Sequence, residues 1–139
     1  MSFTTGDQIR YSVTAASAYL FGVAVMGDPA SDEKMLAAGS IGAEGIGISA
    51  ATVATYGLDS QVVFRGVAKG LVAASLGAWA RVGPANASGA LGPALASGQL
   101  ASSGASAGLY PARYSVGQAL AAGVAGDIIP VLLDPRQIV

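Results

Sequence analysis

Glycine is spread along the whole chain and separates short runs of β-branched and aromatic residues. The sequence has 20 glycines among 139 residues. Each interior glycine costs a helix about 1 kcal/mol relative to alanine. The runs between the glycines have the length of strands: Ile9–Val13, Tyr19–Val25, Gly45–Ile48, Gln61–Phe64, Trp79–Val82 and Ile128–Leu133. Strand-length runs bounded by Gly, Pro, Asp and Ser predict an all-β fold, a small β-barrel or β-tulip-like single domain covering residues 1–139.

Several segments refine this expectation. The polar opening Met1–Gln8 predicts an extended N-terminal arm, and the stretch from Pro84 to Gly108 predicts a long Gly/Ala/Ser loop. An exposed turn is expected over residues 28–34. A short strand from Lys34 to Ala38 is expected to follow, with one helical turn closed by Gly39 as the alternative. Pro130 lies inside the last apolar run, so that strand is predicted to be an edge strand or to contain a bulge.

Two internal echoes suggest a repeat. Gly47 and Gly117 each begin a run of small residues that continues through a turn into an apolar strand, QVVF in one case and IIPVLL in the other. If this echo is structural, it marks two equivalent barrel corners; chance repetition in an Ala- and Gly-rich chain is the alternative. The tetrapeptide RYSV also occurs twice, at residues 10–13 and 113–116.

Charge is scarce. Seven basic and eight acidic residues give a net charge of −1, while 53% of the residues are hydrophobic and mean hydropathy is +0.57. Either partners cover much of the surface or the chain lies in lipid. The longest apolar candidate, 11–27, is at the short limit for a spanning helix and carries hydroxyl groups, so no membrane is expected. The basic residues are scattered singly, which predicts no binding of nucleic acid.

The residues needed for common catalytic sites are missing. There is no Cys and no His, so thiolate nucleophiles, imidazole bases and zinc fingers are excluded. Ser102, Ser103 and Ser106 have no base partner in the sequence. Acids in the 28–34 turn lack a metal-binding spacing. We therefore expect no catalytic residues, no metal and no cofactor, and a protein that is not an enzyme.

The few aromatic residues suggest contacts instead. Trp79 and Tyr110 flank the predicted loop, with Arg81 and Arg113 beside them, and these residue types are enriched at interface centres. Packing of Trp79 into the core is an equally good interpretation. Phe3 in the opening segment has little core to join, which favours an external contact.

Two stretches resemble bacteriophage capsid decoration (cement) proteins: YSVGQALAAGVAGDIIPVLL at 114–133 and EGIGISAATVATYGLDSQVVFRGVAKGL at 44–71. The resemblance covers about two thirds of the chain and departs from the family pattern at Leu58–Asp59, where a plain Gly-Asp is missing. It implies a β-rich virion protein on the outer capsid surface, assembled in the host cytoplasm. Such proteins commonly form homotrimers that bridge subunits of the major capsid protein and stabilise the shell.

Two other functions stay open. The chain could be another virion component, such as a minor head spike or a tail-associated protein, or an enzyme of unrecognised type. Copy number on purified particles separates decoration from a minor component. A buried pair of carboxylates would favour an enzyme.

Overall fold

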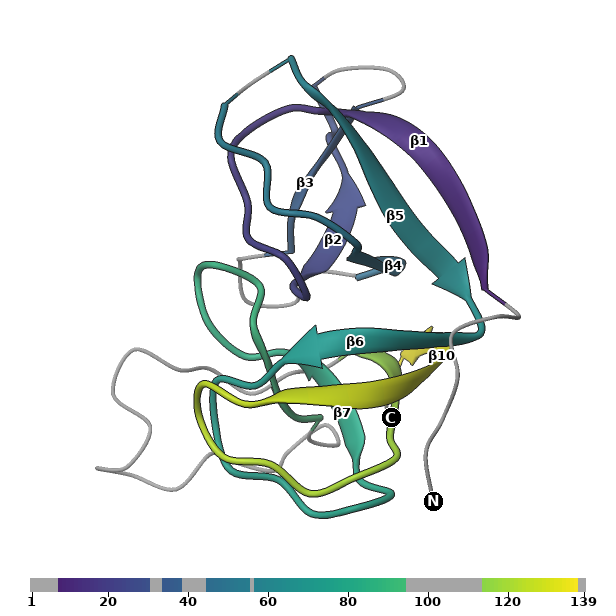
Figure 1. Cartoon of the computed structure of the whole chain (residues 1–139), viewed down its shortest axis with the longest axis vertical. Helices are drawn as coiled ribbons and strands as arrows, with labels where there is room; N and C mark the ends of the chain where they lie inside the picture. Colours follow the sequence, from purple (N-terminus) through teal and green to yellow (C-terminus); the bar gives the residue numbers. More distant parts are fainter. Residues whose placement is uncertain (1–7, 31–33, 39–44, 56, 95–113, 138–139) are drawn as a thin grey trace.

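The computed structural model describes residues 8–30, 34–38, 45–55, 57–94 and 114–137. The described residues form ten strands and no helix, which confirms the predicted all-β fold (Figure 1). The strands are β1 (Ile9–Ala15), β2 (Ala24–Gly27), β3 (Lys34–Ala37), β4 (Gly47–Ser49), β5 (Asp59–Arg65), β6 (Val67–Leu71), β7 (Arg81–Pro84), β8 (Leu91–Pro93), β9 (Tyr114–Ala119) and β10 (Ile128–Gln137). None of the described segments forms a helix long and apolar enough to span a bilayer.

The first half of the chain is a closed barrel with strand order β1-β3-β2-β4-β5. β1 closes it by pairing with β5 in antiparallel and with β3 in parallel orientation. The alternating side chains of these strands turn Ala15, Val25 and Val62 into its core. The short strand expected at residues 34–38 is therefore confirmed as β3.

The second half forms a five-stranded sheet with the order β6-β10-β9-β7-β8. A single parallel bridge between Val72 and Leu91 brings its two outer strands together. The edge-strand prediction for Pro130 is wrong, because β10 pairs with β6 on one side and with β9 on the other. The sheet tolerates the proline because its ladder with β9 starts one residue later, at Val131. A register shift does occur in β10, between Leu133 and Arg136.

The two halves repeat one topology pair by pair. The pairs Val25–Gly47 and Ser49–Val62 of the first half correspond to Val82–Gly117 and Ala119–Val131 of the second. Strands β1 to β5 of the first half correspond in order to β6 to β10 of the second. Corresponding residue numbers differ by 57 between β1 and β6 and between β2 and β7, by 56 between β3 and β8, by 70 between β4 and β9, and by 69 between β5 and β10. The same correspondence holds for irregular contacts: the two-way backbone bonds between Tyr19 and Val53 recur between Leu76 and Gly123.

The echo at Gly47 and Gly117 is thus structural and marks equivalent positions. A Cβ at Gly47 would lie 2.7 Å from the Val63 carbonyl oxygen, and one at Gly117 would lie 2.2 Å from that of Leu132, the counterpart of Val63. Close backbone approach therefore requires glycine at the same place in each half. The RYSV echo does not mark equivalent positions, because residues 10–13 lie in β1 and residues 114–116 lie in β9, which are not counterparts.

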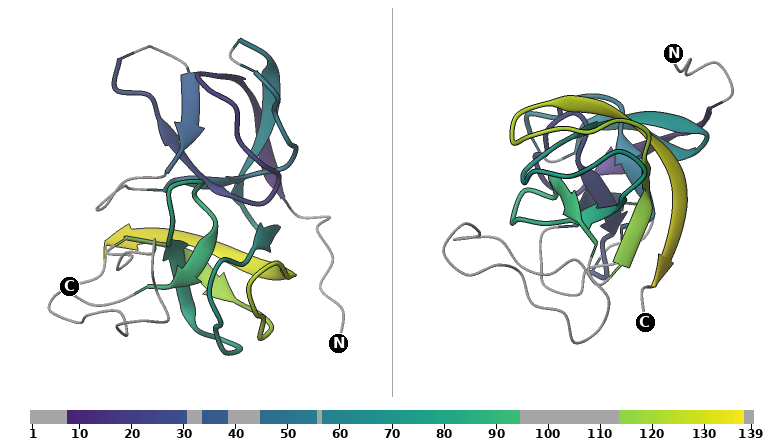
Figure 2. Two further views of the ribbon diagram at one scale, coloured as in Figure 1. Left: turned by 90° about the vertical axis from the view of Figure 1, so that its left-hand side faces the viewer. Right: turned by 90° about the horizontal axis from the view of Figure 1, so that it is seen from below.

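The halves stack end to end, with the first half above the second in Figure 1 and in the left view of Figure 2. Leu71 N donates to Gly22 O and Ala24 N donates to Gly89 O, each at 2.8 Å. One hydrophobic cluster contains side chains from both halves, including Ile48 and Val63 of the first half and Val116 of the second. One core cluster therefore spans both halves, beside the separate cluster that fills the barrel.

Three predicted boundaries differ from the structure. Of the predicted strand 19–25, only Ala24 and Val25 lie in a strand, β2, which continues to Gly27; Gly22 adopts a φ of +80° and turns the chain before it. The loop expected from Pro84 to Gly108 begins with ordered structure, since Pro84 ends β7 and β8 follows a tight turn; residues 95–108 lie outside the described part. Gln8, assigned to the arm, belongs to the fold, because its side-chain amide donates to Val67 O at 2.5 Å.

Candidate interaction surface

Trp79 occupies an exposed turn immediately before β7. Its backbone φ is +67°, and it is the one non-glycine residue with a positive φ among the described segments. The backbone is held there because Trp79 N donates to Ala119 O at 2.7 Å and Trp79 O accepts from the Gln118 side chain at 2.7 Å. The indole side chain is 59% exposed. A large aromatic residue is thus held in an unfavourable backbone conformation and presented to solvent, which is a pattern typical of functional positions.

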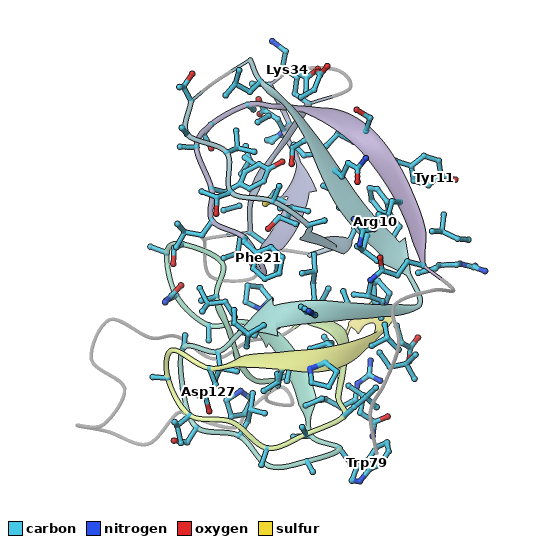
Figure 3. All side chains as sticks on the ribbon, in the orientation of Figure 1. Arg10, Tyr11, Phe21, Lys34, Trp79 and Asp127 are labelled. Carbon is cyan, nitrogen blue, oxygen red and sulfur yellow. The ribbon has the colours of Figure 1, made fainter. Side chains whose placement is uncertain are left out.

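Arg81 lies beside this turn and forms a second polar anchor. Its guanidinium donates to Asp134 Oδ2 at 3.0 Å and to the Asp134 carbonyl oxygen at 2.7 Å. Arg81 pairs with Gln118, and Gln118 pairs with Leu132, so these three side chains form a row across β7, β9 and β10. Leu132 is 42% exposed. We call this surface, made by Trp79, Arg81, Gln118, Leu132 and Asp134, the Trp79 patch (Figure 3).

The structure brings two of the predicted contact residues together. Trp79 and Arg81 share the Trp79 patch, and the alternative that Trp79 fills the core is wrong because its ring is exposed. The other three predicted contacts, Phe3, Tyr110 and Arg113, lie outside the described residues and stay predictions.

A second surface was not foreseen from the sequence. A groove with a volume of ≈ 720 Å³ opens on the first half, between β1 and the residues that flank β2 and β3. Its lining includes Tyr11, Thr14, Lys34, Ile46 and Phe64. Tyr11 is 59% exposed and Ile46 is 37% exposed, and the Tyr11 ring meets Phe64 edge-to-face at 5.3 Å between centroids. We call this feature the Tyr11 groove.

The signal for the Tyr11 groove was present in the repeat. When the two halves are aligned by their strand pairing, Tyr11 of the first half takes the position of Ala68 in the second. A large aromatic residue therefore stands where the other half has a buried alanine. Sequence identity between the halves is too low to reveal this register without the structure.

Two buried serine hydroxyl groups in the described segments have structural roles. Ser49 Oγ donates to Leu20 O at 2.6 Å and accepts from Val23 N at 3.2 Å. Ser115 Oγ donates to Gly117 O at 2.9 Å. Such bonds satisfy backbone groups at strand ends and provide no activated nucleophile.

No protein-family model matches the chain, and no curated protein sequence matches it. A solved structure does resemble it in fold: the head fiber gp8.5 N base of bacteriophage phi29. The TM-score is 0.62 at 12% identity, and the alignment covers 95% of this chain and 98% of that chain. The shared fold thus extends over nearly the whole of both molecules.

Proposed function

We propose that the protein is a structural component of a phage virion, bound to the outer surface of the head through the major capsid protein. The observation that carries the proposal is the fold likeness to a phage head fiber base, which spans almost the full length of both chains. At 12% identity that likeness concerns the fold, so the function is our inference.

The surface chemistry supports a role in assembly. Two surfaces that expose large apolar side chains, the Trp79 patch with Trp79 and Leu132 and the Tyr11 groove with Tyr11 and Ile46, lie on a chain with only 15 charged residues out of 139. Apolar and aromatic side chains exposed together are typical of sites that another protein covers. We propose a decoration protein, self-associated as a homotrimer, that bridges neighbouring capsid subunits and stabilises the shell without catalysis. Each copy adds contact area, so rupture of the shell requires many contacts to break together.

A second candidate is the base of a head fibre or spike. The printed description of the structural neighbour favours it, since that protein is the base of a fiber. The two candidates predict different copy numbers on the particle, hundreds for a decoration protein and few for a minor spike.

The test is cosedimentation of the purified protein with phage heads that lack it. We expect saturable binding, and the saturating ratio of this protein to major capsid protein distinguishes the two candidates. Bovine serum albumin mixed with the same heads controls for trapping in the pellet. Failure to sediment with heads at any ratio would remove the proposal.

A further inference from the structure

The two halves contact each other through faces that are not the same. The first half contributes the outer side of β2, β4 and β5, where Ala24, Ile48 and Val63 form a row across three paired strands. These side chains belong to one cluster with Ala68 and Val116 of the second half. The internal contact is therefore heterologous: the lower face of one half meets the upper end of the other (Figure 1).

The second half carries the counterpart of the docking row, and among the described residues this row is only partly covered: Arg81 and Gln118 are half-buried, and Leu132 is exposed. The repeat places Arg81 at the position of Ala24, Gln118 at that of Ile48 and Leu132 at that of Val63. Val63 is 2% exposed, whereas Leu132 is 42% exposed. This row is the Trp79 patch.

The first half carries the counterpart of the receiving surface, which is also open. Tyr11 corresponds to Ala68 and Ile46 corresponds to Val116. Ala68 and Val116 are fully buried in the shared cluster, whereas Tyr11 and Ile46 are among the exposed large apolar residues. This surface is the Tyr11 groove.

We propose that the Trp79 patch of one copy docks into the Tyr11 groove of a second copy, repeating between chains the contact that joins the two halves within a chain. The occupant is a second copy because the molecule already contains this contact once, between counterparts of these two surfaces. Within one chain they cannot meet: Trp79 lies at the lower end of the molecule and Lys34, on the groove, at the upper end (Figure 3).

One position shows how the contact between chains differs from the internal one. Gly22 approaches β6 so closely that a Cβ would lie 2.8 Å from Leu71 N. In the repeat, Trp79 stands at the position of Gly22. The β6 residues Lys69 and Leu71 correspond to Ser12 and Thr14, which line the Tyr11 groove. The indole therefore takes the place of a tight backbone contact, and the open groove beside Tyr11 provides the space that it needs.

The charges of the two surfaces are compatible. Arg81 and Asp134 form an ion pair on the patch, and Asp28 and Lys34 both line the groove. Counted over the described residues, each surface thus contains one acid and one base, so no net repulsion between these residues opposes the contact. Trp79 on one side and Tyr11 on the other are of the residue types that dominate binding energy when buried. Leu132 and Ile46 add exposed apolar area to the two surfaces.

The test blocks each surface separately and then mixes the blocked proteins. Leu132→Glu places a charge in the Trp79 patch and leaves the Tyr11 groove intact. Ile46→Glu places a charge in the Tyr11 groove and leaves the Trp79 patch intact. We expect the wild type to self-associate in sedimentation equilibrium and each variant to associate about tenfold or more weakly. An equimolar mixture of the two variants retains one good patch and one good groove, so we expect it to form a dimer that grows no further. Trp79→Ser is a second patch variant; because the Trp79 side chain is exposed to solvent, its removal leaves the core packing intact.

Matched controls come from the repeat itself. Ile128 is exposed on the same strand as Leu132. Its counterpart in the first half, Asp59, is exposed and is not buried in the internal contact, so Ile128 is not expected to take part in the contact between chains. Leu58 likewise corresponds to the exposed Asp127. Ile128→Glu and Leu58→Asp should therefore associate as the wild type does. Circular dichroism confirms that all variants fold.

The inference rests on the self-association included in the proposed function, and the outcomes separate the two. A monomeric wild type at every concentration overturns both the homotrimer and this contact. A self-associating wild type whose blocked variants still associate, or whose mixed variants stay monomeric, overturns this contact alone. Binding to heads is measured independently and is unaffected by either result.

Discussion

Two buried hydroxyl groups of the first half, those of Tyr19 and Ser49, differ in their hydrogen bonding. Tyr19 is 4% exposed, and its hydroxyl has no hydrogen-bond partner in the described part of the chain. Ser49, also buried, both donates and accepts. The two hydroxyl groups therefore have opposite energetic consequences, because a buried polar group stabilises only when it is paired.

Replacing each hydroxyl tests this contrast. We expect Tyr19→Phe to leave the free energy of unfolding unchanged or to raise it by up to about 1 kcal/mol, because an unpaired buried group is removed. Ser49→Ala should lower it by about 1–2 kcal/mol, since Val23 N and Leu20 O lose their partner. Urea unfolding monitored by fluorescence measures both. A clear loss of stability in Tyr19→Phe would contradict the assignment.

Gly117 offers a second test at this scale. We expect Gly117→Ala to destabilise the protein by about 2 kcal/mol or more, because its Cβ would meet the Leu132 carbonyl, a backbone atom that cannot move aside cheaply. Gly77→Ala is the control: nothing lies within 4 Å of that Cβ, so the change should stay within about 0.5 kcal/mol. Thermal denaturation compares the two. Equal melting temperatures would argue against the close approach of β9 and β10.

At the scale of elements, strand content could be predicted and strand partners could not. Runs of β-branched residues located β1, β5 and β10 well, because a strand needs only a local pattern. β8 was missed, since Leu-Gly-Pro has no such pattern and is a strand only because β7 pairs with it. Pro130 was assigned to an edge strand or a bulge on a local rule; the sheet order places its strand centrally, and the register shift of β10 comes later, between Leu133 and Arg136. Pairing depends on residues far apart in sequence, and local propensity does not report it.

The turns that precede β5 and β10 give a prediction for equivalent elements. Gly57 and Gly126 have φ values of +89° and +94°, and no atom lies within 4 Å of a Cβ at either. Alanine at either position should therefore lower the free energy of unfolding by about 1 kcal/mol through backbone strain alone. The loss should be similar in the two halves. Asparagine should cost less, because it tolerates this conformation. Chemical denaturation of the four variants checks the equality; a large difference between halves would show that the turns are not equivalent.

For the whole molecule, the candidate site could be predicted only in part. Trp79 and Arg81 were chosen because aromatic residues and arginine are common at interfaces, and the structure sets them side by side. The Tyr11 groove depends on the alignment of two halves with few identical residues, so no linear pattern in the sequence indicates it. The absence of Cys and His was informative because it limited the chemistry whatever the fold.

The N-terminal segment can be tested at this scale too. We expect deletion of residues 1–7 to abolish binding to phage heads and to leave the melting temperature unchanged. The deletion stops before Gln8, because that side chain bonds to Val67 O across the two halves. Cosedimentation and calorimetry give the two readouts. Deleting Gln8 as well is the control that should lower stability, and head binding that survives the shorter deletion would assign the contact elsewhere.

The unlike ends of the stacked halves give the molecule a direction. A protein whose two ends were identical could be turned over in an assembly without consequence. Here one end carries Trp79 and the other carries Lys34, so any assembly that joins unlike ends inherits a fixed polarity. Every copy then points the same way around it, and one rim can be specialised for a supporting surface while the opposite rim faces outward.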